Sequence, residues 1–248
     1  MKIAVLMWYD SKIKYYADNF YKINSIYCQK NNYTLIKSST RRYNKRNQYQ
    51  RRNAHWERFP LILKYIENYD YVVWIDADAF FYVDSAPLEN IINKYNKEIF
   101  LSADCDQRSP PAINSGVIIL KNTQQVKNIV EKWAFCEELK YKYLVEQGYL
   151  DNWIEDQAMI RGCYRDNVDD IKRLSVVIPY LELQHYHKNE IDISADTAEI
   201  DFREGTPQGV MPYIFHLAGR PQDREAESKI YLKKINLDRH LRQMDRGQ

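Results

Sequence analysis

The segment from Trp74 to Phe80 contains two aspartates, Asp76 and Asp78, directly after an apolar run. The run, Tyr71 to Ile75, has the length and composition of a strand that is buried on both faces. Ligands of open α/β sheets bind at the carboxyl ends of strands, where this pair is expected to lie. Two carboxylates in an apolar setting repel each other and lose hydration, so they need a cation or a hydrogen-bond donor to stay ionised.

Such a pair has a second interpretation, because Asp-x-Asp also occurs by chance, with one aspartate capping a turn and the other solvated. The position after five apolar residues, and before two aromatic residues and Asp84, favours a metal site. Hard oxygen ligands select Mg²⁺ or Mn²⁺, which completes its shell with waters and substrate phosphates.

The rest of the sequence indicates strands that alternate with helices. The expected strands are residues 3–7, 33–36, 71–75, 99–103, 117–120, 176–179 and 213–216, and the expected helices are residues 11–30, 56–66, 87–95, 123–144 and 153–162. This alternation predicts a single α/β domain with a mostly parallel central sheet and helices on both faces. We expect residues 1–222 to form the domain and residues 223–248 to form a charged C-terminal helix or tail.

The composition excludes several classes of protein. Lys and Arg total 36 and Asp and Glu total 34, so the net charge of +2 gives no general attraction for nucleic acid or an anionic membrane. No apolar run approaches the roughly 18 residues of a membrane span, and the first apolar segment is too short for a signal peptide. The four cysteines have no C-x-x-C spacing, so we expect reduced thiols and a cytoplasmic protein.

Four blocks occur in an order that resembles a known family: Trp74 to Asp78, Asn114 to Val117, Glu155 to Gln157, and His216 to Gly219. Together with Tyr27-Cys28 and with Trp56 to Leu61, they resemble the retaining glycosyltransferase family 34, which has the GT-A type of fold. The likeness spans roughly residues 3–221.

The resemblance implies a metal site made of Asp76, Asp78 and His216. An imidazole ligand beside carboxylates suits Mn²⁺ better than Mg²⁺. Taken alone, His216 has the ordinary interpretation of a hydrogen-bonded core histidine.

The resemblance also implies that Asn114, Ser115 and Gly116 face the donor sugar, with Gly116 allowing close approach of the backbone. The plain alternative is a turn before a strand. Asp156 and Gln157 resemble the acidic-glutamine pair beneath the reacting sugar carbon. Asp156 is otherwise an ordinary first-turn residue, favoured by the helix dipole.

Two arginines are expected to bind the donor. Arg58 lies in the block that resembles the family's tryptophan-basic-proline helix start. Five residues after His216, where the resemblance implies a lysine on the diphosphate, the sequence has Pro221; we therefore expect the adjacent Arg220 to neutralise that charge.

The function implied is transfer of a hexose or xylose from a UDP- or GDP-sugar to a saccharide hydroxyl. Retention of configuration could arise by front-face attack or by a covalent intermediate on a carboxylate. Front-face attack is favoured, because the resembling position is Gln157, a poor nucleophile. Two alternatives remain open: a non-catalytic nucleotide-sugar or carbohydrate binder, and a nucleotidyltransferase, although no glycine-rich phosphate loop supports the latter.

Three further features have no assigned role. The basic stretch 38–53, with Tyr43 and Tyr49 among its arginines, is interpreted as a loop, a lid, or a strip for single-stranded nucleic acid. His185 and His187 lie two apart and could bind a metal together. The sequence is compatible with a homodimer and does not specify an oligomeric state.

Overall fold

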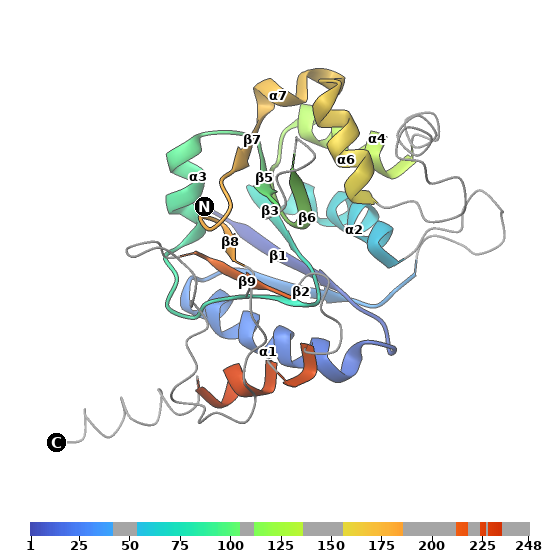
Figure 1. The fold of residues 1–248 in the computed structure, drawn as a ribbon. Helices are drawn as coiled ribbons and strands as arrows, with labels where there is room; N and C mark the ends of the chain where they lie inside the picture. The colour runs from blue at the N-terminus through green and yellow to red at the C-terminus, as the bar shows by residue number, and fades with distance from the viewer. Residues whose placement is uncertain are drawn as a thin grey trace.

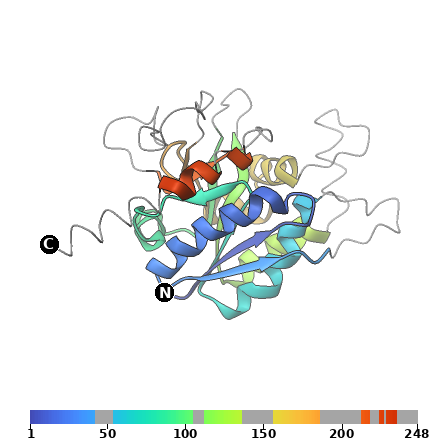
Figure 2. The ribbon, with the colours of Figure 1, turned by 90° about the horizontal axis from the view of Figure 1, so that it is seen from below.

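The computed structural model describes residues 1–41, 54–104, 112–135, 156–185, 212–217, 224–226 and 228–234. In this part of the chain, a central sheet and a smaller sheet lie between two layers of helices (Figures 1 and 2). The α/β class, the mostly parallel sheet and the helices on both faces are confirmed.

The central sheet has six strands in the order β2-β1-β3-β6-β5-β7. Their bounds are β1 Ile3–Trp8, β2 Thr34–Ser38, β3 Tyr71–Ile75, β5 Ile99–Ala103, β6 Ile113–Lys121 and β7 Ser175–Ile178. The pairs β1·β2, β1·β3 and β5·β7 are parallel, whereas β6 runs antiparallel to both β3 and β5. Because β6 points the opposite way, its beginning lies beside the end of β3.

The smaller sheet has three short strands in the order β4-β9-β8. Their bounds are β4 Ala79–Phe81, β8 Gln184–His185 and β9 Ile214–His216. Only β9 is predicted from the sequence. Strands of three and two residues are too short to show an alternating pattern, so they are recognisable only through their pairing.

Helices cover both faces of the central sheet. One side carries α1 Lys14–Lys30 and α3 Leu88–Tyr95; the other carries η2 Ala54–Glu57, α2 Arg58–Tyr65, α4 Gln124–Phe135, α6 Asp156–Arg165 and α7 Ile171–Leu174, with short turns η3 Ile66–Asn68 and η4 Val168–Asp170. Residues 224–226 and 228–234 are also helical and lie along α1, coloured red in Figures 1 and 2.

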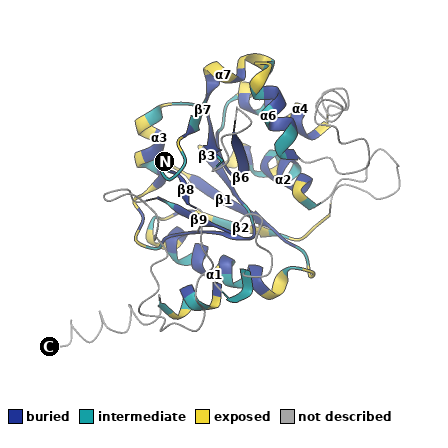
Figure 3. Ribbon diagram, in the orientation of Figure 1, coloured by how far each residue is buried: buried dark blue, intermediate teal, exposed yellow. Residues whose placement is uncertain are grey.

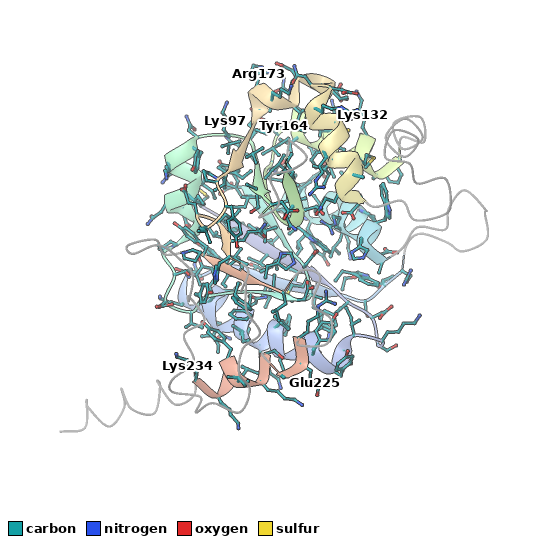
Figure 4. The ribbon with its side chains drawn as sticks, viewed as in Figure 1. Lys97, Lys132, Tyr164, Arg173, Glu225 and Lys234 are labelled. Atoms are coloured by element: carbon teal, nitrogen blue, oxygen red, sulfur yellow. The ribbon has the colours of Figure 1, made fainter. Side chains whose placement is uncertain are left out.

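The two cores follow from the alternation of side chains along the strands. In β1, Ile3, Val5 and Met7 face the α1 side, whereas Ala4, Leu6 and Trp8 face the α2 side. Most strands are dark blue in Figure 3, whereas the edge strand β2 is intermediate to exposed, and other exposed residues lie on the outer surfaces of the helices. The labelled charged side chains of Figure 4, among them Lys97, Arg173 and Lys234, lie at the periphery.

Two local expectations need correction. The helix expected from residue 11 begins at Lys14, after Ile13, and no side chain caps it, so the predicted capping by Ser11 is wrong. The strand expected over residues 117–120 is longer: β6 begins at Ile113 and includes Asn114 to Gly116, which excludes the alternative of a turn there. In the described residues, Cys28 and Cys163 are free thiols. No helix there is both long and apolar enough to cross a membrane.

Candidate active site

The acidic pair lies in the turn between β3 and β4. The backbone N–H of Asp76 donates to the carbonyl of Gly116 at 2.8 Å, and the N–H of Ala79 donates to the carbonyl of Asp76 at 3.1 Å. The first bond continues the β3–β6 ladder and places Asp76 opposite Gly116; the second closes a tight turn. The sequence Asp-Ala-Asp therefore projects from the carboxyl end of a buried strand, as predicted.

His216 reaches this turn through the smaller sheet. Strand β9 pairs with β4 so that His216 lies opposite Ala79, and the N–H of Leu217 donates to the carbonyl of Asp78 at 3.0 Å. His216 Nε2 is 3.4 Å from Asp78 Oδ1. One ligand atom from each of Asp76, Asp78 and His216 lies within 4.8 Å of the others. Residues that are 138 positions apart, from 78 to 216, thus form one cluster.

Two basic side chains surround the buried carboxylate of Asp78. Arg224 Nη2 lies 2.6 Å from Asp78 Oδ2, and His216 faces Oδ1. Burial acts to raise the pKa of Asp78, but the hydrogen bond and charge of His216 and the charge of Arg224 outweigh it and lower the pKa to about 2. Asp78 is therefore an anion at neutral pH, in the form that a metal ion needs.

Asp76 is oriented through one of its two oxygens. Trp74 Nε1 donates to Oδ1 at 2.7 Å, and Arg58 Nη2 donates to the same oxygen at 3.2 Å. Within the described part of the chain, Oδ2 accepts no hydrogen bond and can face an ion. Two carboxylates and an imidazole, held around one point, fit a small divalent cation of the Mn²⁺ type.

Gly116 makes room for the imidazole of His216. A Cβ atom at this position would lie 2.1 Å from His216 Cε1 and 2.9 Å from His216 Nδ1. Real Cβ atoms do not approach other atoms so closely, so any side chain at residue 116 would displace the ring. The close neighbour that requires a glycine here is a protein side chain, whereas the sequence predicts close approach of a ligand.

Arg58 connects several parts of the site. Its side chain is only 1% exposed. Nη1 donates to the carbonyl of Ser115, Nη2 to Asp76, and Nε to the carbonyl of His55 at 3.0 Å. Nε also lies 2.8 Å from Asp156 Oδ2. The guanidinium thus links the first metal-ligand candidate to the start of α6.

Asp156 and Gln157 form the beginning of α6, as predicted. Burial raises the pKa of Asp156, although the positive charge of Arg58 acts in the opposite direction. Gln157 Oε1 accepts hydrogen bonds from the backbone N–H and the hydroxyl of Ser115, at 3.0 and 3.3 Å. The glutamine amide is therefore fixed against β6, at the residue whose carbonyl accepts from Arg58.

The structure brings together most of the residues expected from the sequence. Asn114 lies in the same strand as Ser115, and its Oδ1 accepts from the N–H of Gly116 at 2.8 Å. Arg220, most of the basic stretch 38–53, and His187 lie outside the described residues. His185 is buried, and its Nδ1 lies 3.2 Å from the hydroxyl of Tyr82.

Comparison with solved structures identifies the fold. The crystal structure of a glycosyltransferase involved in the glycosylation of the major capsid of PBCV-1 superposes with a TM-score of 0.63 at 14% identity, over 92% of this chain and 100% of that one. The galactosyltransferase LgtC, in complex with donor and acceptor sugar analogues, superposes with a TM-score of 0.50 at 10% identity, over 88% of this chain and 87% of that one. The chain has the GT-A fold. No protein-family model matches the sequence, and no curated protein does.

Within this GT-A fold, two residues of the site were missed from the sequence. Arg224 reaches Asp78 from the helical residues 224–226, and Gln184 Oε1 lies 3.3 Å from His216 Nδ1. Neither belongs to a recognisable motif. Arg224 is one of many charged residues near the C-terminus, and Gln184 is a single polar residue between Leu183 and His185. Only tertiary packing brings them to the acidic pair.

Proposed function

We propose that this chain is a metal-dependent retaining glycosyltransferase that moves a hexose or xylose from a UDP- or GDP-sugar to a saccharide hydroxyl. The observation that carries the proposal is the cluster of Asp76, Asp78 and His216 within 4.8 Å, at the carboxyl end of a central strand in a GT-A fold. The ordered blocks that resemble family 34 support it. The family itself, the donor and the acceptor are part of the proposal.

In this proposal, Asp76, Asp78 and His216 hold a Mn²⁺ ion. A divalent ion there would neutralise the negative charge that grows on the departing nucleotide diphosphate, an effect typically of several kcal/mol. Asp78 suits this role because its low pKa keeps it ionised without a proton to displace. Arg220, four residues after His216, is proposed to contribute charge to the same diphosphate.

The other side of the site is proposed to handle the sugar. Asp156 would orient the acceptor hydroxyl or, in the ionised form that the charge of Arg58 favours, stabilise the positive charge on the sugar ring. Arg58 forms ion pairs with both Asp76 and Asp156 and so fixes their positions relative to each other. Ser115 donates two hydrogen bonds to the side-chain oxygen Oε1 of Gln157. The side-chain NH₂ group of Gln157 would therefore be the end that faces a ligand. An amide is a poor nucleophile, which favours front-face attack over a covalent intermediate.

Hydrolysis of the donor tests the proposal directly. The purified chain is incubated with Mn²⁺ and a panel of UDP- and GDP-sugars, and free sugar is measured; thermal shift on the same panel identifies which donor binds. We expect one donor class to be stabilising and slowly hydrolysed, and Asp78→Ala to reduce the rate at least about 100-fold. Asp169→Ala, which removes the carboxylate paired with Lys132 outside the site, is the matched control and should leave the rate unchanged.

The same experiment separates the enzyme from a non-catalytic binder. A binder would be stabilised by a nucleotide sugar and would release no sugar, with or without saccharide acceptors. Stabilisation by a donor without turnover, or turnover that survives Asp78→Ala, would reject the metal-dependent enzyme.

A further inference from the structure

Gln184 is a fully buried amide that lies between the two sheets. It belongs to β8, where it pairs with Ile214 of β9, and its side chain is turned towards the central sheet. The side-chain Nε2 donates to the carbonyl of Ala103, at the end of β5, at 3.3 Å. The side-chain Oε1 lies 3.3 Å from Nδ1 of His216. The amide thus joins the end of a central strand to the imidazole of the site.

The chemistry of these two contacts determines the orientation of the amide. A carbonyl oxygen can only accept a hydrogen bond, so the NH₂ end of Gln184 must face Ala103. The amide oxygen is then the atom that faces His216. Because that oxygen also can only accept, Nδ1 of His216 must carry a hydrogen and donate it.

The orientation of the amide in turn determines which imidazole nitrogen can bind a metal. A neutral imidazole carries one N–H, so a hydrogen on Nδ1 leaves the lone pair on Nε2. Nε2 is the atom that lies 3.4 Å from Asp78 Oδ1. A bound metal ion would be shared by these two lone pairs, and it would take the place of the hydrogen through which a charged imidazole donates to Asp78. The lone pair is therefore presented towards the carboxylates, as a metal ligand requires.

Two further features reinforce this arrangement. The register of β9 with β4 fixes the position of His216 beside the acidic turn, and the missing side chain of Gly116 leaves space for the ring. Neither constraint selects the tautomer or the rotation of the imidazole about its own axis. Among the contacts described here, that of Gln184 does both.

We infer that Gln184 is a positioning residue for the metal site: it holds His216 in the tautomer and orientation that present Nε2 to the ion. The inference rests on the proposed function, because it assumes that His216 is a ligand. It does not place Gln184 in contact with the ion or the substrate.

Binding of Mn²⁺ alone, measured by the loss of the free-ion electron paramagnetic resonance signal, tests the inference without any turnover. Gln184→Met keeps the length of the side chain and removes both polar ends. We expect it to weaken Mn²⁺ binding about tenfold, the lower end of what loss of an orienting partner of a metal ligand costs. Gln184→Asn, whose amide is too short to reach both Ala103 and His216, should weaken binding in the same direction while retaining a polar group in the pocket.

A matched control is available at Tyr82, which contacts His185, the next residue of β8. Tyr82→Phe removes the hydroxyl that contacts Nδ1 of His185, which is likewise a buried hydrogen bond to an imidazole in the smaller sheet. It should lower the melting temperature by an amount similar to that of Gln184→Met and leave Mn²⁺ affinity unchanged. Equal losses of Mn²⁺ affinity in the two variants would show a general packing effect and overturn the inference.

A double-mutant cycle with His216→Ala distinguishes positioning from any other effect of Gln184. If Gln184 acts through the imidazole, Gln184→Met should cause no further loss of Mn²⁺ affinity once His216 is alanine. A full additional loss would overturn the inference. If His216→Ala leaves Mn²⁺ binding unchanged, the proposed metal site itself is wrong. If His216→Ala weakens Mn²⁺ binding and Gln184→Met does not, the metal site stands and only the role of Gln184 is wrong.

Discussion

Arg224 Nη2 lies 2.6 Å from Oδ2 of Asp78, so an arginine from the C-terminal helical segment neutralises a carboxylate of the proposed metal site. The segment is held in place by other contacts: Tyr231 stacks on Phe80 with 4.2 Å between ring centroids, and Ser228 accepts from Asn19 at 3.1 Å. The guanidinium therefore approaches Asp78 from an element that is packed against α1. A metal ion and Arg224 would compete for the same negative charge.

Arg224→Met is expected to strengthen binding of Mn²⁺ alone, because it removes the competing positive charge and keeps the apolar part of the side chain. An increase of roughly tenfold corresponds to about 1.4 kcal/mol. Titration followed by electron paramagnetic resonance measures it. Lys229→Met, which removes an exposed charge of the same helical segment, should leave Mn²⁺ affinity unchanged. Weaker Mn²⁺ binding by Arg224→Met would mean that Arg224 supports the site and does not compete with the ion.

Gly116→Ala should disturb the site through steric overlap. The new methyl group would meet the imidazole of His216 at 2.1 Å from Cε1, so the ring must move away from Asp78. We expect a loss of Mn²⁺ affinity comparable to that of His216→Ala, and a loss of stability of about 1–3 kcal/mol from overpacking. In the His216→Ala background only the approach of 2.9 Å to Asn114 Oδ1 remains, so Gly116→Ala should then lower the melting temperature by much less. An equally large effect in that background would place the cause in the contact with Asn114.

The acidic pair was predictable because its signal is local. Five apolar residues of β3 lead directly to Asp76, and the position of such a pair at a strand end follows from the sheet alone. His216 was predictable only through the order of blocks that resembles a family. No local pattern relates it to Asp78; the relation is made by pairing of β9 with β4, and each of those strands is only three residues long.

The orienting groups of the site could not be predicted, because their roles depend on long-range packing. Gln184 acts through an imidazole 32 residues away, and Arg224 reaches Asp78 only because its helical segment packs on α1. Arg58 was expected to contact a donor, and the structure shows its nitrogens engaged with His55, Ser115 and Asp76. A sequence reveals the type of a side chain, but the atoms that surround it come from the tertiary fold.

Arg58→Met should destabilise the protein strongly. The guanidinium is buried between the carboxylates of Asp76 and Asp156, and its removal leaves both negative charges without this positive partner. We expect a loss of about 3–5 kcal/mol in the free energy of unfolding, measured by urea denaturation. Arg173→Met, at an exposed ion pair with Asp170, should change it by less than about 0.5 kcal/mol. Adding Asp156→Asn to Arg58→Met should recover part of the loss, and no recovery would indicate that the lost packing of the arginine dominates.

The raised pKa of Asp156 predicts a specific dependence of stability on pH. Burial raises the pKa of this carboxyl in the folded state, although Arg58 opposes it, so folding favours the protonated form. The contribution of Asp156 to stability is then fully present below the unfolded-state pKa of about 3.9 and is lost as the pH rises through the folded-state pKa. Asp156→Asn cannot ionise and does not undergo this loss.

Urea denaturation of the wild type and Asp156→Asn at several pH values, with a chelator to remove metal ions, measures this difference. The two proteins should have similar stability near pH 3, and the variant should become the more stable of the two as the pH rises. Asp170→Asn provides a control of opposite sign, because the hydrogen bond from Arg173 lowers the pKa of that exposed carboxyl. The contribution of Asp170 to the stability of the wild type is present above the unfolded-state pKa and is lost as the pH falls through the folded-state pKa. If the wild type instead gains stability over Asp156→Asn with rising pH, the compensation by Arg58 exceeds the cost of burial, and Asp156 is a permanent anion in the site.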